Sequence, residues 1–361
     1  MITRLRKLPV WVYLLSMLFL LFPAYKEWEA SRLHSRVTHD CLDPKKMLEF
    51  CYIDYYEKVA KELGSREAQR LLHAHMDTDP YLRTNCHEAM HEIGHAAFDE
   101  YGSISEAYVH ADYACWGGYL HGVVEESLRG KSLKDISAET LQTLCDAAKA
   151  KGERSFQYFS CVHGIGHALM FVSDNDLPTA LVRCDDLIHN WARGQCVNGA
   201  FMQNMFSKYN DHQSDYLPKD DLHFPCNIAR EKDQSACYQV QGRPILDAYN
   251  WDFTKSFAFC AALSTDDLRF ACADGLGAAV SNHSAYEPKK IVQLCSKAGT
   301  LENGCLYGAL TDLEGVVGDQ SLGEKVCALE PADKAMMCTE TLKRTHNDFP
   351  GSVNENQSGD D

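Results

Sequence analysis

The chain has 361 residues and a formal net charge of −16, with 51 acidic against 35 basic side chains. An acidic chain with no basic stretch after its first residues argues against nucleic acid as a partner, because phosphate backbones attract clustered lysine and arginine. The length fits two ordinary domains or one array of repeats.

Residues 1–25 have the order of a membrane-targeting segment. Three basic residues precede an uncharged apolar run from Leu8 to Tyr25, which is just long enough for a helix that crosses a bilayer. Because the run lacks a good cleavage site, we predict an uncleaved signal anchor with its N-terminus in the cytoplasm. The body would then lie in a periplasm, a lumen or the extracellular space, behind a polar stalk at residues 26–40.

The 16 cysteines are the strongest signal in the rest of the chain. An even number of cysteines without any CxxC motif, in an exported protein, predicts disulfides rather than metal clusters. Neighbour pairing is the simplest of the possible connectivities. In chain order it joins 41/51, 86/115, 145/161, 184/196, 226/237, 260/272, 295/305 and 327/338.

The cysteines also mark a repeat. From Cys145 onward the first members of the couples recur every 32 to 42 residues, the length of one helix-turn-helix unit. Glycine stands three residues after several second cysteines, as at Gly164 and Gly199. Glycine destabilises helices, so this register predicts close contact between helices.

These patterns predict an all-α, disulfide-stapled helical-repeat body. Its architecture resembles α-solenoids of the Sel1 and TPR type, although their consensus residues are not matched, and the resemblance carries no function. We expect histidine-rich repeats at 41–175, further disulfide-stapled repeats at 176–344 and a disordered acidic tail at 345–361.

The candidate chemistry lies in two similar segments. His91-Glu-Ile-Gly-His95-Ala and His163-Gly-Ile-Gly-His167-Ala share five letters of six. Each pair places two imidazoles one helical turn apart, which is the spacing of a metal clip. His121 stands six residues after Cys115, as His167 does after Cys161.

Equal registers line up along one surface of a repeat array. We therefore predict a metal site of His91, His95, His121, His163 and His167, together with Glu125 one turn beyond His121. In later repeats the positions two and six residues after the cysteine carry other residue types, so the site is expected to end with the Cys161 repeat. The alternative is that these histidines serve packing and hydrogen bonding.

A second motif overlaps the first. His87-Glu88-Ala-Met-His91 satisfies HExxH, the zinc-protease pattern,. A third histidine at the metzincin spacing is missing, since Ala97 stands there. Asn85 to Glu88 also resembles a helix capping box. We therefore take the repeated HxIGHA as the meaningful unit, which leaves His87 outside the site.

Three functions compete. The first is a metal-dependent enzyme with a mono- or dinuclear Zn, Fe or Cu centre, either activating water for hydrolysis with Glu125 or Glu92 as the base, or activating oxygen. The second is a scaffold that binds a peptide or partner protein at the membrane. The third is a metal carrier or sensor. The clustering of histidines in the first half favours the enzyme.

Overall fold

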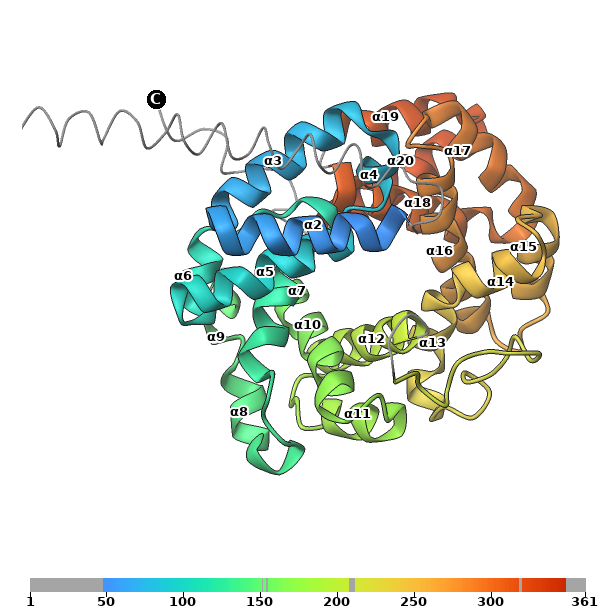
Figure 1. Ribbon diagram of the computed structural model, residues 1–361. Coiled ribbons are helices and arrows are strands. Elements are labelled where there is room, and N and C mark those ends of the chain that lie inside the picture. Colours follow the sequence, from blue (N-terminus) through green and yellow to red (C-terminus); the bar gives the residue numbers. More distant parts are fainter. Residues whose placement is uncertain (1–47, 151, 154, 208–211, 318–319, 349–361) are drawn as a thin grey trace, which may run out of the picture.

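Helices form the whole regular structure of the described residues, which are 48–348 except 151, 154, 208–211 and 318–319. Figure 1 shows this computed structural model, in which helices surround a central opening. The described part of the chain contains no β-strand. The all-α prediction is confirmed.

The described chain begins with a group of helices that leads into the ring. α2 packs on α3 and on α5, and α5 packs on α7. The bounds of these helices are α2 Leu48–Leu63, α3 Ser65–Thr78, α4 Pro80–Thr84, α5 His87–Tyr101 and α6 Ile104–Val109.

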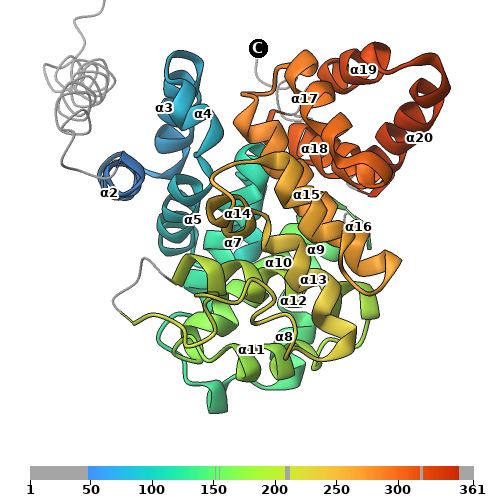
Figure 2. The same ribbon diagram turned by 90° about the vertical axis from the view of Figure 1, so that its right-hand side faces the viewer.

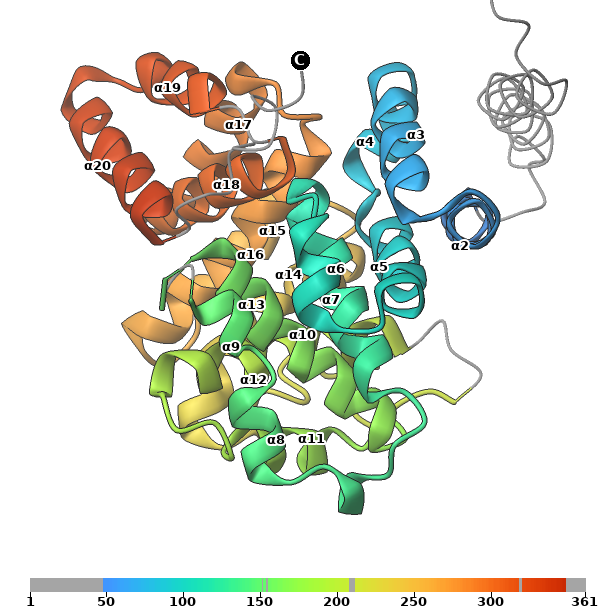
Figure 3. The ribbon, with the colours of Figure 1, turned by 90° about the vertical axis from the view of Figure 1, so that its left-hand side faces the viewer.

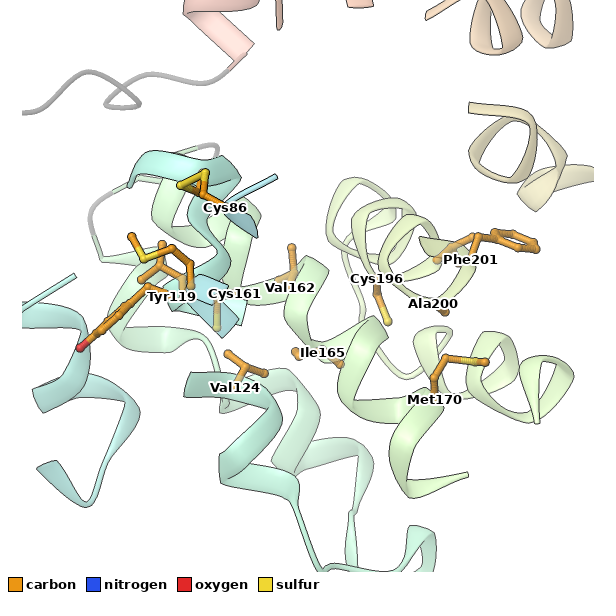
Figure 4. Packing of buried hydrophobic residues seen from close by; sticks show 14 of the residues in the cluster. Cys86, Tyr119, Val124, Cys161, Val162, Ile165, Met170, Cys196, Ala200 and Phe201 are labelled. Carbon is orange, nitrogen blue, oxygen red and sulfur yellow. A yellow bond between two sulfur atoms is a disulfide. The ribbon is translucent and has the colours of Figure 1, made fainter. Parts of the chain in front are cut away.

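The ring itself consists of inner helices that follow one another around the opening. Each packs against the next in the order α7, α10, α12, α13, α16 and α18, and α14 packs against α16. Their bounds are α7 Ala114–Leu128, α10 Phe156–Val172, α12 Asn190–Phe206, α13 Gln234–Val240, α14 Gly242–Ala248, α16 Asp266–His283 and α18 Glu302–Val317. Val124 of α7, Ile165 of α10 and Ala200 of α12 belong to the buried apolar cluster drawn in Figure 4.

Further helices lie outside the inner ones. They are α8 Ala138–Thr143, α9 Asp146–Lys149, α11 Leu177–Cys184, α15 Phe253–Ala261, α17 Pro288–Cys295, α19 Gln320–Leu329 and α20 Ala332–Asp348, with 3-10 turns η1 Leu133–Asp135, η3 Glu231–Asp233 and η4 Ser296–Leu301. The N-terminal helices and α17 to α20 lie on the same side of the molecule, opposite α8 and α11 (Figures 2 and 3).

Disulfides join segments that follow one another along the array of helices. Seven predicted neighbour couples, from 86–115 to 327–338, are disulfide-bonded. A short bridge of this kind removes entropy from the unfolded chain, by about 3 kcal/mol for a loop of 15 residues. Their number indicates an oxidising, extracytoplasmic environment.

The array of helices closes on itself, which differs from an open solenoid. α18 packs against α7, and Nε1 of Trp116 donates a hydrogen bond to Oδ1 of Asp312 at 2.8 Å. Nearby, Nδ2 of Asn282 donates to the carbonyl oxygen of Thr84 at 2.6 Å. The helix pairs therefore enclose a space instead of presenting an extended concave surface.

The recurring glycines act as predicted. A Cβ atom on Gly199 would lie 2.1 Å from the carbonyl oxygen of His163, and one on Gly275 would lie 1.8 Å from that of Gln239. These distances are far inside van der Waals contact, so successive inner helices touch backbone to backbone.

Some predictions fall outside the described residues. They are the anchor at 1–25, the stalk at 26–40 and Cys41 of the first couple. Among the residues that the structure does describe, no helix is long and apolar enough to cross a membrane. The predicted tail at 345–361 begins inside α20, which continues to Asp348.

Candidate metal centre

Three neighbouring helices bring five imidazoles together. α5 contributes His87 and His91, α7 contributes His121, and α10 contributes His163 and His167. Their ring nitrogens, with one oxygen of Glu125, form three overlapping groups whose members lie within 4.8 Å of one another. The groups are His87, His91 and His121; His121, His163 and His167; and His91, Glu125 and His167.

Glycines make this convergence possible, because an imidazole reaches only a short distance from its backbone. A Cβ atom on Gly122 of α7 would lie 2.1 Å from the carbonyl oxygen of His91, and one on Gly164 of α10 would lie 3.1 Å from Cα of His121. The three helices can therefore approach closely enough for short side chains from each to meet.

One hydrogen bond and one contact with a carboxylate orient two of the rings on α5. Nδ1 of His87 lies 2.7 Å from the carbonyl oxygen of Cys115, and Nδ1 of His91 lies 3.0 Å from Oε1 of Glu125. Both oxygens favour a hydrogen on Nδ1. Burial opposes the charged form of His91, but Glu125 and Glu88 outweigh it and raise the pKa of His91 above its usual range. The two Nε2 atoms face each other at 3.0 Å, a separation that a proton or a shared metal ion satisfies, since two nitrogens on one zinc ion lie about 3.3 Å apart.

The remaining imidazoles are buried with unsatisfied nitrogens. Nδ1 of His167 lies 3.0 Å from Oε1 of Gln203. Its Nε2, Nδ1 of His163 and both nitrogens of His121 are buried and make no hydrogen bond with the described residues. Buried polar atoms are normally paired, so these nitrogens point to a ligand.

Electrostatics keep most of these rings neutral. Burial, aided by the neighbouring imidazoles, lowers the pKa of His121 and His163 well below its usual range, and burial lowers the pKa of His167 to about 4. Neutral imidazole is the form that binds metal. Burial also lowers the pKa of His87 to about 3, so its Nε2 is unprotonated.

Comparison with family models, curated proteins and solved structures finds no match for this chain. The function is therefore inferred from the residues of the site.

Glu125 is buried among the histidines instead of facing an open space. Its Oε2 lies 2.8 Å from Nε2 of His95, while its Oε1 lies near His91 and His167. Burial opposes the charged form, but His91 and His95 hold the pKa of this carboxyl well below its usual range. Glu125 is thus ionised and compensates the positive charge of the cluster.

His95, a predicted ligand, lies beside the three groups and in none of them. Its Nε2 contacts Glu125, and its Nδ1 lies 3.3 Å from Oε2 of Glu92. Burial works against the charged imidazolium, but the two carboxylates outweigh it and raise the pKa of His95 to about 9. With a hydrogen on both nitrogens, this ring has no lone pair to offer a metal.

His87 is the ligand candidate that the sequence interpretation left out. The capping box at Asn85 does not form, because α5 begins after Cys86 and the Asn85 side chain donates to the carbonyl oxygen of Tyr81 instead. The HExxH spacing was the signal that contained His87, and both of its histidines share a group with His121.

The cluster borders a cavity of about 950 Å³ inside the ring. His87, Glu88, His121 and His163 line one wall. The residues that stand two positions after the later cysteines also line the cavity, and they are Asn198, Gln239, Asp274 and Tyr307. Glu92 and Glu125, the predicted bases, are not among the lining residues.

Two hydrogen bonds link part of this lining. Nδ2 of Asn198 donates to Oε1 of Gln239 at 2.8 Å, and Nε2 of Gln239 donates to Oδ2 of Asp274 at 2.7 Å. Hydrogen-bonded polar side chains that line the cavity thereby join three successive inner helices, α12, α13 and α16. The cavity therefore has a metal-binding wall, polar side chains fixed in orientation, and apolar lining residues such as Phe159 and Met202.

Asp312 also lines the cavity and provides a test of its electrostatics. Burial raises the pKa of this carboxyl to about 7, although the hydrogen bond from Trp116 opposes the shift. The folded protein then keeps this proton up to about pH 7, whereas the unfolded chain loses it near the ordinary aspartate pKa of 3.8. The stabilisation is fully present below about pH 4 and is lost as the pH rises through 7.

We expect Asp312→Asn to remove this pH dependence. Between pH 4 and 7 the free energy of unfolding of the wild type should fall relative to the variant by about 1.4 kcal/mol per pH unit. Urea unfolding of both proteins at pH 5 and pH 8 measures the difference, and all other titrating groups are common to both. An equal difference at the two pH values would show that the carboxyl is ionised throughout.

Proposed function

We propose that this protein is an extracytoplasmic, metal-dependent enzyme that hydrolyses its substrate inside the ring cavity, held at a membrane by its N-terminal segment. The observation that carries the proposal is that His87, Glu88 and His121 line the cavity, and that His91 belongs to the same ligand group as these two histidines. The site combines three imidazoles from two helices with a carboxylate that lines the cavity.

The metal would be a transition ion, because imidazole suits zinc, iron and copper. His87, His91 and His121 would hold such an ion, which would supply an acidified water and polarise the bond to be cleaved. Three protein ligands would leave one coordination position for that water, as in catalytic zinc sites.

Glu88 is the best-placed base in the described part of the chain. It lies on the first turn of α5 and lines the cavity, next in the chain to His87 of the first group. Glu88 would remove a proton from the attacking water and deliver it to the leaving group, so that the reaction consumes one water and no other reactant. Glu125 and Glu92 would instead hold His91 and His95.

The structure gives less support to the two other functions. A scaffold for a peptide or partner protein needs an open surface, whereas the inner helices close into a ring. A carrier needs exchangeable ligands, whereas His91, His121, His163 and His167 are buried. Oxygen chemistry at iron or copper is the alternative within the enzyme class, because all five histidines offer nitrogen ligands.

Glu88→Gln tests the proposal, with Glu92→Gln as its matched control one turn later on α5. Loaded with zinc and assayed on chromogenic esters, amides and phosphate esters, Glu88→Gln should lose about 10²- to 10⁴-fold of the hydrolytic rate and keep its metal. Glu92→Gln should stay close to the wild type, because Glu92 does not line the cavity.

Equal hydrolytic rates for the wild type and Glu88→Gln would show that Glu88 takes no part in the reaction. Dioxygen consumption by the iron- or copper-loaded protein, without hydrolysis of any of these compounds, would favour the oxygen-activating alternative.

A further inference from the structure

The two all-histidine groups of the metal centre have one member in common. His87 and His91 form the first group with His121, and His163 and His167 form the second with the same His121. The proposed hydrolytic site uses only the first group, which leaves His163 and His167 without a role.

His121 differs from His87, His91 and His167 in its hydrogen bonding. A metal-binding histidine normally donates its second nitrogen to a carboxylate, a carbonyl or water. His87 and His167 follow this rule, through Cys115 and Gln203. Both nitrogens of His121 are buried and have no hydrogen-bond partner among the described residues, so both are directed at something other than protein.

The spacing of the rings fits one ion on each side of His121. Two imidazoles on one tetrahedral ion have ring centroids about 5 Å apart. The His121 centroid lies 5.2 Å from that of His87 and 5.3 Å from that of His91. In the second group, it lies 4.8 Å from that of His163 and 5.5 Å from that of His167, and the last two lie 4.9 Å apart.

We propose that His163 and His167 form a second metal site, and that His121 bridges the two ions through its two ring nitrogens. This inference rests on the first site of the proposed function. Binding of both ions releases the remaining ring proton of His121 to solvent, since each nitrogen then donates its lone pair to an ion. The bridging ring becomes an imidazolate.

The second ion would also reach the cavity. His163 and His121 line the same wall, and Gln203 holds His167 from behind. Ions on the two nitrogens of one imidazolate would lie about 6 Å apart, wider than in sites whose two ions share one water, so each ion would bind an oxygen of its own. The second site therefore predicts a substrate that offers an oxygen to each ion, such as a phosphate ester or a carboxylate-bearing compound.

Metal stoichiometry and copper spectroscopy of the full chain test the bridge. We expect two copper(II) ions per wild-type chain, with a weakened electron paramagnetic resonance signal because an imidazolate bridge couples the two spins. His163→Ala should bind one ion and show the full signal of isolated copper. His87→Ala should likewise retain one ion, at the second site.

A second variant separates loss of the site from loss of the fold. His163→Gln keeps a polar side chain of similar reach, and circular dichroism confirms that each variant is folded. One ion in the wild type, lost in His87→Ala and unaffected in both His163 variants, would overturn the second site and leave the proposed function standing. No ion in the wild type would overturn both.

Two ions that remain in the folded His163 variants would also overturn the assignment. That result would point to the group containing Glu125, because its other members, His91 and His167, are intact in these variants.

Discussion

Gly199→Ala is expected to lower the free energy of unfolding by about 3 kcal/mol or more, the upper range for overpacking a close-packed core. The added methyl group would lie 2.1 Å from the carbonyl oxygen of His163. Because that atom belongs to a helix backbone, α12 must move away from α10. The same movement displaces His163 and should weaken metal binding as well.

Gly194→Ala provides the matched control, since both glycines lie in α12. A Cβ atom on Gly194 meets no other atom within 4 Å, and alanine favours a helix over glycine by up to about 1 kcal/mol. The control should therefore be neutral or stabilising. Urea unfolding with the disulfides intact measures both, and equal stabilities would contradict the backbone contact between α10 and α12.

The largest expected effect on metal binding comes from His91→Ala. His91 belongs to two of the three ligand groups, and its loss leaves the first group with two imidazoles. We expect the dissociation constant for zinc, measured by competition with a chelator, to rise by more than roughly 10- to 100-fold. That range is typical when a residue hydrogen-bonded to a metal ligand is lost.

His95→Ala is the control for this measurement. His95 lies one turn after His91 on α5, is also in contact with Glu125, and belongs to none of the groups. Its removal should raise the dissociation constant for zinc by no more than about 10- to 100-fold, as expected for a residue that only orients other residues. A larger loss of zinc affinity in His95→Ala than in His91→Ala would place the metal ion beside His95, one turn after His91 on α5, instead of beside His87, one turn before it.

The repeat itself could be predicted from the sequence because its signals are local. The order of the cysteines along the chain makes neighbour pairing the simplest connectivity. A glycine three residues after a cysteine predicts the close contact between helices. The convergence of His121, His163 and His167 follows from the same register. These features depend on residues within one or two repeat units.

The choice between His87 and His95 could not be predicted in the same way. His87 lies one helical turn before His91 and His95 lies one turn after it. Helical periodicity places both on the same face as His91. The two carboxylates of Glu92 and Glu125 occupy both nitrogens of His95, and only their positions in three dimensions show it.

The closure of the helices into a ring could not be predicted from the sequence either. Trp116 and Asp312, which help to form it, are separated by 196 positions. This long-range contact also encloses the cavity, so the placement of Glu88 at its wall and of Glu125 away from it could not be foreseen.

Metal content of the purified full chain, produced in an oxidising compartment and measured by mass spectrometry, tests the central claim most directly. We predict at least one equivalent of zinc, iron or copper in the wild type, and a marked loss in His91→Ala under the same preparation. A wild-type protein that contains no transition metal, and takes up none on reconstitution, would contradict the metal centre and the function proposed from it.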